Sequence, residues 1–317
     1  MPSTPVAILD STMTDIADAI RSKTGGSATM RPGQMPAQIA SIPSGGGGVG
    51  IPREVDASGV YGVPIDSFTF SLPSNATSLA IYSLYYALYN CLGVTSVDMH
   101  TLTSITTDSA MYWAFHGCIA LRSVDLRSLA TVSGQTAMSA AFQQCRSLTS
   151  VDLSSLTTVS GTQCMNSIFY GCSSLTSINL GSLTTLSATS CMANAFSRTG
   201  ITSITFTSLA SITGLQALNG AFSYCGDLQS VSFPALTTIS GSNAFNNAFS
   251  NCSSLTSLSF PALTTDSFGS NTNQFNNMLR SVIECTVHFP AAVQSIIEGM
   301  TGYPNFGGTN TTVLFDL

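Results

Sequence analysis

Cysteine recurs at a fixed interval along most of the chain. The marker positions are 27 residues apart, with one interval of 26, and they hold Cys91, Cys118, Cys145, Cys172, Thr199, Cys225 and Cys252. A constant period of this length is the signature of a solenoid, in which similar units stack on one another. Because one unit cannot bury its own apolar side, neighbouring units must share a continuous core. The period therefore predicts an elongated stack of turns.

Each repeat carries two apolar motifs, one on either side of its marker. Before the marker, apolar residues are spaced by four and then three, as in Met138, Phe142 and Cys145, which predicts a short amphipathic helix. After it, the apolar residues of 148–153 fall at the first, fourth and sixth positions, and the last pair alternates as in a strand. The sequence thus predicts an α/β solenoid, a right-handed superhelix of about eight turns with a parallel β-sheet on one face and short helices on the other.

The repeated pattern resembles a known family. The spacing Leu-x-x-Val-x-Leu with a helical return is similar to leucine-rich repeats. Residues 141–150, Ala-Phe-x-x-Cys-x-Ser-Leu-Thr-Ser, resemble the BspA-like class of bacterial and microbial surface proteins. The resemblance covers about residues 83–289. Units of 27 residues are longer than we expect for this class, so the returning loop should be enlarged.

The ends of the chain depart from the repeat. We expect residues 51–82 to cap the first turn, residues 83–286 to form the solenoid, and residues 287–317 to close it with a strand, a helix over 290–300 and a last strand over 312–317. Caps are needed because an open end exposes core and unpaired strand edges. Residues 44–50 are a Gly-rich linker.

Residues 1–43 form a separate N-terminal module. Met13, Ile16 and Ile20 lie on one side of a predicted helix, and a second short helix follows near residues 36–42. Residues 15–26 and 35–42 resemble N-terminal segments of tail-associated structural proteins of phages and prophages. Helices this short need a partner for stability. We therefore expect this module to attach the chain to other virion or tail proteins, or to copies of itself as a homo-oligomer.

Composition narrows the classes of function. Only 8% of residues are charged, the net charge is −6, and the nine basic residues are scattered, which argues against a nucleic-acid partner. No segment is long enough to span a membrane, and the N-terminus lacks the pattern of a secretory signal. We expect a virion or extracellular location reached by lysis or on a particle.

No enzyme motif accompanies the repeats. The sequence contains neither a Gly-x-Ser-x-Gly elbow nor a phosphate-binding glycine loop, and its three histidines are isolated. The regular spacing of the cysteines predicts buried, structural thiols, with disulfides between adjacent turns as the alternative. We therefore predict no catalytic residue, no cofactor and no metal site.

Two surface features stand out from the repeat. The first is an acidic strip along the strand face, formed by Asp98, Asp125, Asp152 and Asn179. Stacked carboxylates repel one another. Arg122, Arg127 and Arg146 lie in the same turns and are expected to compensate, while a bound cation or polar ligand is the alternative.

The second feature is an aromatic cluster in the first two turns. Positions that are polar or small in later turns here hold Tyr85, Tyr86, Tyr89, Tyr112, Trp113 and His116. Aromatic side chains on a polar face indicate a contact. The contact could be residues 51–82, another subunit or particle, or a carbohydrate.

These observations predict a non-enzymatic binding or structural protein. We expect a virion-associated or tail-associated protein that displays its solenoid to a host-surface glycan or protein. A BspA-like bacterial surface adhesin and a structural decoration protein without a ligand are the two alternatives.

Overall fold

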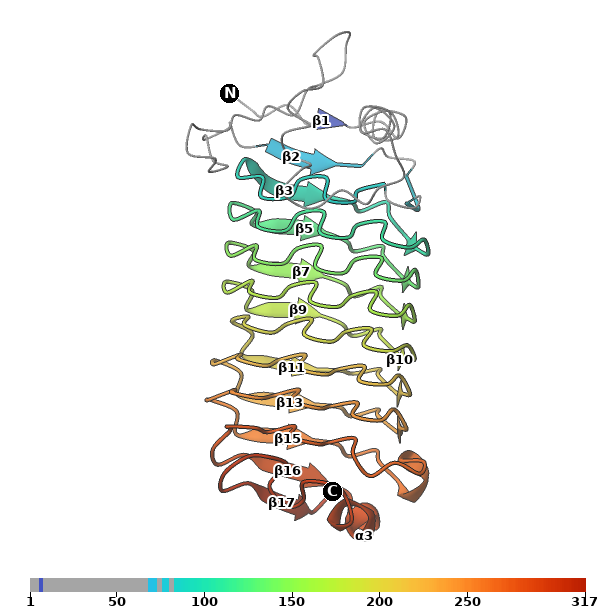
Figure 1. Cartoon of the computed structure of the whole chain (residues 1–317), viewed down its shortest axis with the longest axis vertical. Coiled ribbons are helices and arrows are strands. Elements are labelled where there is room, and N and C mark those ends of the chain that lie inside the picture. Colours follow the sequence, from blue (N-terminus) through green and yellow to red (C-terminus); the bar gives the residue numbers. More distant parts are fainter. Residues whose placement is uncertain (1–5, 8–67, 73–75, 80–82) are drawn as a thin grey trace, which may run out of the picture.

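The protein is a stack of similar turns, seen in a computed structural model that describes residues 6–7, 68–72, 76–79 and 83–317. The turns follow one another down the long axis of the molecule, and the C-terminal elements close its lower end (Figure 1). The predicted leucine-rich-repeat-like solenoid with a parallel sheet is confirmed. It contains about nine turns rather than eight.

One long face of the solenoid is a row of parallel strands. These pair in the orders β1-β2-β3-β5-β7-β9 and β11-β13-β15-β16-β17. Their bounds are β1 Val6–Ala7, β2 Phe68–Ser71, β3 Val94–Asp98, β5 Ser123–Asp125, β7 Ser150–Asp152, β9 Ser177–Asn179, β11 Ser203–Thr205, β13 Ser230–Ser232, β15 Ser257–Ser259, β16 Thr286–Phe289 and β17 Thr312–Phe315.

The ladder is interrupted between β9 and β11, beside the one turn that is a residue shorter than the others. The missing residue falls just after Thr199, where Gly200 occupies a tight position. A Cβ at Gly200 would lie 2.7 Å from the carbonyl oxygen of Ser173. Only glycine therefore fits the shortened turn without a shift of backbone.

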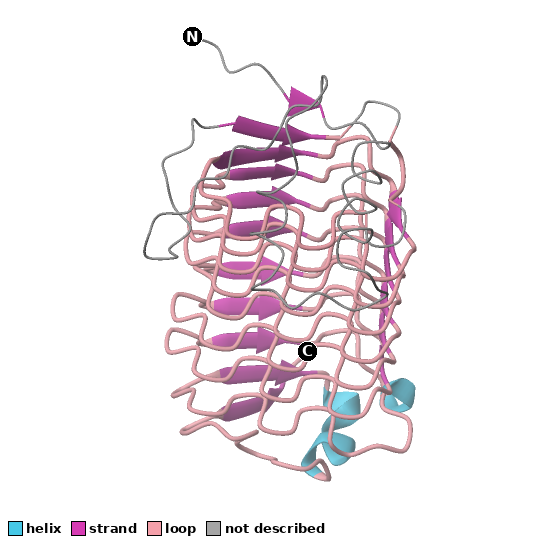
Figure 2. Cartoon of the chain, turned by 45° about the horizontal axis from the view of Figure 1, so that its top comes forward, coloured by secondary structure: helices cyan, strands magenta, loops and turns pink. Residues whose placement is uncertain are grey.

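A second parallel sheet runs along a neighbouring face. Each of its strands has two residues, one buried and one half-buried. They are β4 Ser104–Ile105, β6 Thr131–Val132, β8 Thr158–Val159, β10 Thr185–Leu186, β12 Ser211–Ile212 and β14 Thr238–Ile239. Figure 2 shows them as a row at the right-hand edge of the molecule.

The short helices predicted before each marker do not form. In their place the chain makes a series of turns in which about every fourth residue is left-handed, with φ of +49° at Thr136, +53° at Ala140 and +62° at Gln144. Met138 and Phe142 are four residues apart, and both face the core because the local backbone turns of this segment repeat every four residues. The same spacing fits a helix of 3.6 residues per turn, which is why the prediction was wrong.

Hydrogen bonds explain why turns replace helices. Alternate N–H groups donate to the next turn of the solenoid, as from Met138 to the carbonyl of Cys164 (2.7 Å) and from Phe142 to that of Ile168 (3.0 Å). The N–H groups between them donate three residues back, as from Ala141 to Met138 (3.1 Å). Buried backbone groups must be paired. Here the pairing is shared between neighbouring turns.

Phenylalanine stacks fill the core. One column joins the turns from Phe115 to Phe249, with neighbouring ring centroids 5.2–6.0 Å apart. A second column behind the strands runs from Phe206 to Phe289, with centroids 4.9–5.3 Å apart. Stacked rings bury large apolar areas and favour offset contacts at these distances. Identical apolar positions thus form continuous columns through the molecule.

Further strands lie at both ends of the solenoid. At the C-terminal end the two expected strands appear as β16 and β17, and the expected helix is a 3-10 turn η2 (Ala291–Val293) followed by α3 (Gln294–Glu298). At the other end lies β2. One further 3-10 turn, η1, spans Thr265–Ser267. Of the N-terminal module, the described part is β1, which pairs with β2 through Val6 and Phe70. The predicted attachment residues Met13, Ile16 and Ile20 lie outside the described residues, as do the Gly-rich linker and residues 51–67.

Within the described ranges, no helix is long and apolar enough to cross a membrane.

Candidate binding surfaces

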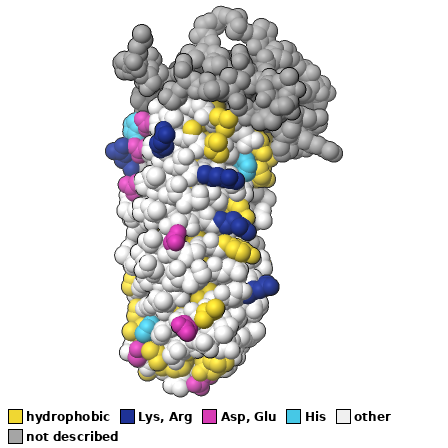
Figure 3. Space-filling model, turned by 90° about the vertical axis from the view of Figure 1, so that its left-hand side faces the viewer, with side chains coloured by type: hydrophobic (Ala, Val, Ile, Leu, Met, Phe, Trp, Pro, Cys, Tyr) yellow, Lys and Arg dark blue, Asp and Glu magenta, His cyan; other side chains and the backbone are white. Residues whose placement is uncertain are grey.

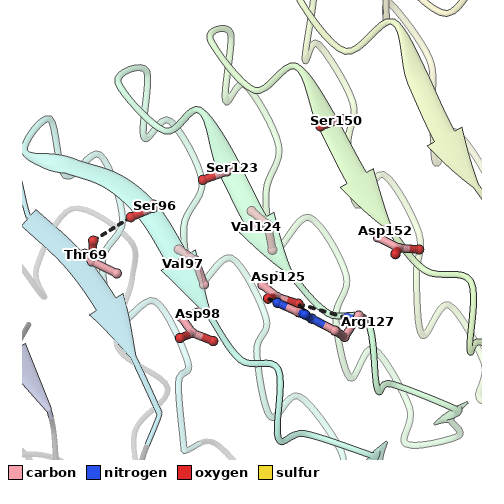
Figure 4. A pocket seen from close by; sticks show the side chains of 10 residues that line it. All are labelled: Thr69, Ser96, Val97, Asp98, Ser123, Val124, Asp125, Arg127, Ser150 and Asp152. Carbon is pink, nitrogen blue, oxygen red and sulfur yellow. Dashed lines mark hydrogen bonds and ion pairs between the residues drawn. The ribbon is translucent and has the colours of Figure 1, made fainter.

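The acidic strip forms as the repeat predicts. Strand register pairs Asp98 with Asp125, Asp125 with Asp152, and Asp152 with Asn179. The first three line a shallow groove of about 470 Å³ on the strand face (Figure 4). The side chains project from the ends of β3, β5 and β7. Three carboxylates therefore lie one above another, one strand spacing apart.

Each member of the strip accepts a backbone hydrogen bond from the residue two positions on. The donors are the N–H groups of His100 (3.2 Å), Arg127 (3.2 Å), Ser154 (2.9 Å) and Gly181 (3.0 Å). This turn explains why Asp or Asn recurs at the end of these strands, since both form such turns readily. The strip thus has a structural role in turning the chain away from the sheet.

Charge on the strip is partly neutralised. Arg127 forms an ion pair with Asp125, and this hydrogen bonding holds the pKa of the Asp125 carboxyl below its usual range. The ring Nδ1 of His100 lies 2.6 Å from Asp98. Arg146, a further predicted partner, bonds instead to the side chain of Gln144 (3.1 and 3.2 Å). Among the described residues, no group of three or more His, Cys, Asp and Glu is arranged to hold a metal ion.

The six rings of the aromatic cluster come together on the turn side of the molecule. Stacked pairs link the two turns, with centroids 5.4 Å apart for Tyr85 and Tyr112 and 5.8 Å for Tyr86 and Trp113. His116 stacks on Trp113 at 4.3 Å and on Tyr89 at 4.9 Å. Tyr86 is buried and the other five are half-buried. The cluster is one connected surface rather than separate rings.

Burial sets the chemistry of this cluster. Loss of water around His116 lowers its pKa to about 4, and a hydrogen bond with the side chain of Gln143 opposes part of that shift. The ring is therefore neutral at physiological pH. Its Nδ1 is enclosed without a hydrogen-bond partner. Burial also raises the pKa of Tyr86, and the neighbouring tyrosines add to that rise. The surface is therefore uncharged, aromatic and polar only at a few atoms, which suits binding better than acid–base catalysis.

A third cluster was not indicated by the sequence analysis. Arg198 lies over the ring of Tyr224 at 4.3 Å and near that of Tyr170 at 6.0 Å. Tyr224 is 50% exposed. The signal was present in the alignment of repeats, because Arg198 and Tyr224 occupy equivalent positions in successive turns.

The repeats identify a family. The family described as BspA type Leucine rich repeat region (6 copies) matches residues 84–217 and 189–296, well over half of the chain. The protein belongs to the BspA-type leucine-rich repeat family. The resemblance of the repeat to this class is thereby confirmed, with boundaries close to those expected.

Solved structures with similar repeats come from several bacteria. A leucine-rich repeat protein of T. pallidum is 16% identical and covers 82% of this chain and 96% of its own, with a TM-score of 0.24. One from Bacteroides ovatus is 16% identical over 77% and 82%, with a TM-score of 0.20. An internalin of Listeria monocytogenes is 13% identical over 95% and 90%, with a TM-score of 0.25. No curated protein matches this BspA-type chain.

The marker cysteines of this BspA-type chain are buried and free. Several thiols donate to a carbonyl of the preceding turn, as from Cys145 to Phe115 (3.1 Å) and from Cys252 to Phe222 (3.0 Å). Thr199 takes the same place in its turn, and its hydroxyl donates to Phe196 (2.8 Å). All nine cysteines are buried and free, which confirms their structural interpretation.

Proposed function

We propose that this BspA-type chain is a non-enzymatic binding protein that presents its solenoid at a surface. The observation that supports the proposal is the aromatic cluster. At the equivalent positions of later turns the chain places Ser139, Asn166 and Asn246. Half-buried aromatic rings on an otherwise polar side are typical of contact surfaces, because they supply a large area at a small entropic cost.

Trp113 makes the proposal directly testable, since it is the single tryptophan of the chain. Its fluorescence reports on the cluster without background from elsewhere. We expect a ligand found on an array of glycans and extracellular host proteins to shift or quench this emission on titration. Tyr112→Ser, which keeps Trp113 but removes a neighbouring ring, should weaken binding about tenfold.

A matched control uses a tyrosine far from the cluster. Tyr303→Ser, near the C-terminal end, should leave the affinity unchanged. Binding that leaves Trp113 emission unaltered, or that Tyr303→Ser weakens as much as Tyr112→Ser, would place the contact elsewhere and contradict the proposal.

The attachment of the chain is a separate part of the proposal. We infer from the resemblance of residues 15–26 and 35–42 that residues 1–43 hold the protein on a virion or tail structure, or join copies of it. A BspA-like adhesin on a bacterial surface is the second candidate, favoured by the family. Light scattering on the full chain and on a chain starting at Gly50 tests the module. A defined oligomer that becomes a monomer on truncation supports self-association, and two monomers rule it out.

A further inference from the structure

Arginine and tyrosine side chains continue along the same side of the molecule beyond the aromatic cluster. Hydrogen bonds between successive turns fix the register, as from Gln144 N–H to the carbonyl of Tyr170 (2.7 Å) and from Arg198 N–H to that of Ser223 (2.9 Å). We call the edge that carries Arg146, Tyr170, Arg198, Tyr224 and Arg280 the turn edge. In Figure 3 basic side chains descend this face beside hydrophobic ones, and acidic side chains lie to their left.

The positive charge of the turn edge is not neutralised by nearby carboxylates. Among the arginines in the described part of the chain, Arg127 is the one held in an ion pair, and it lies on the strand face. Arg146 bonds to the neutral amide of Gln144, and Arg198 stacks on Tyr224. Stacking occupies the flat face of a guanidinium and leaves its in-plane N–H groups available to an anion. The edge therefore combines unpaired cations with aromatic rings.

Spacing along the edge is set by the solenoid. Successive turns are about 4.8 Å apart, so Arg146 and Arg198, two turns apart, are separated along the axis by roughly 10 Å. A pyranose unit in an extended polysaccharide advances by a distance close to one turn. Aromatic rings pack against the apolar faces of sugars, guanidinium groups bind carboxylates in a forked geometry, and amide side chains such as Gln144 bind hydroxyls.

We propose that the turn edge binds an anionic polysaccharide that lies along the axis of the solenoid. The proposal rests on the proposed function and names the class of ligand for that side of the molecule. The aromatic cluster forms one end of the path, and Arg198 with Tyr224 lies near its middle.

Three soluble probes test the proposal on the full chain by titration calorimetry: polygalacturonate, neutral dextran and polyglutamate. Polygalacturonate should bind, and its affinity should fall as salt is added. Dextran should bind far more weakly. Polyglutamate carries carboxylates without sugar rings and should also bind far more weakly. Equal affinity for polyglutamate would show a general anion site and overturn the proposal.

Single substitutions locate the site. Arg198→Gln should weaken polygalacturonate binding about fivefold to tenfold, because a charge-assisted contact is lost. Tyr224→Ser should also weaken it. Arg127→Gln changes the net charge equally but lies on the strand face, so it should leave the affinity unchanged. An equal loss with Arg127→Gln would overturn the proposal. If polygalacturonate does not bind while another ligand alters Trp113 emission, this inference fails and the proposed function stands.

Discussion

Single residues in this protein adopt a backbone conformation that side chains normally avoid. In the described part of the chain, twenty-two non-glycine residues have positive φ, and most recur every fourth residue in the turn segments. For a residue with a Cβ, the left-handed conformation is less stable than the right-handed one by about 1 kcal/mol. The turn segments tolerate this cost because their N–H and carbonyl groups are paired with the neighbouring turns.

Glycine should therefore stabilise the protein at an exposed left-handed position. Gln163 is exposed and has φ of +53°. We expect Gln163→Gly to raise the free energy of unfolding by about 0.5–1 kcal/mol, measured by urea denaturation. Thr162 is exposed beside it without positive φ, and Thr162→Gly should lower that free energy by a similar amount. Loss of stability in both variants would contradict the argument.

The buried thiols should be chemically inert in the folded protein. Burial raises the pKa of Cys164 to about 12 and that of Cys191 to about 11, from 9.0. At pH 8 we expect less than about one of the nine thiols to react with Ellman's reagent, and all nine to react in urea. Rapid reaction in the native state would show that the core opens.

The same shifts predict how stability depends on pH. The folded state favours the neutral thiols, so their stabilising contribution is fully present below pH 9. This contribution is lost as the pH rises through the raised pKa values of the folded protein. We expect the urea midpoint to fall between about pH 9 and pH 12. A midpoint that rises over this range would contradict the sign of the shifts.

At the scale of elements, each turn is built from two strands and a turn segment whose hydrogen bonds cross to the next turn. The conformation of a segment therefore depends more on how it packs against the next turn of the solenoid than on its own helix or strand propensity. The fit is tight in the shortened turn at Gly200, because a Cβ there would meet the backbone of the neighbouring turn rather than a side chain.

Substitution by alanine should affect stability differently at Gly200 and Gly226, which each follow the marker position in successive turns. Gly200→Ala places its Cβ 2.7 Å from the Ser173 carbonyl oxygen, and we expect the free energy of unfolding to fall by about 1–3 kcal/mol. Gly226 follows its marker cysteine as Gly200 follows Thr199, but a Cβ there lies 3.7 Å from the hydroxyl of Ser253. Gly226→Ala should change stability by less than about 0.5 kcal/mol. Equal effects in urea denaturation would refute the steric explanation.

At the scale of the whole molecule, the solenoid depends on its ends. β17 pairs with β16 in full register, and Phe315 stacks on Phe289 with centroids 6.2 Å apart. An uncovered strand edge is a template for pairing with another chain. The C-terminal strand therefore protects the core and keeps neighbouring molecules apart.

Removal of β17 should make the protein associate. For a chain ending at Asn310, we expect the mass measured by light scattering to rise with concentration, because the edge of β16 and the ring of Phe289 are uncovered. Thr286→Lys in the same truncated chain places a charge on that edge and should restore the mass of the full-length protein. A truncated chain whose mass does not vary with concentration would show that β17 is not a protective cap.

The sequence by itself determined the period, the strand after each marker, the buried columns and the C-terminal cap. These features follow from apolar residues at fixed intervals, which any stacked arrangement must turn inward. The aromatic cluster and the acidic strip were also visible, because alignment of the repeats places equivalent residues side by side.

Only the tertiary structure decided how the remaining backbone is arranged. A spacing of four between Met138 and Phe142 fits both a helix and a four-residue turn, and the choice depends on hydrogen bonds to residues 26 positions away. The two-residue strands of the second sheet are likewise stable only when paired with neighbouring turns. The stacking of Arg198 on Tyr224 depends on side-chain conformation. Local sequence could not settle these features because the interactions that select them are not local.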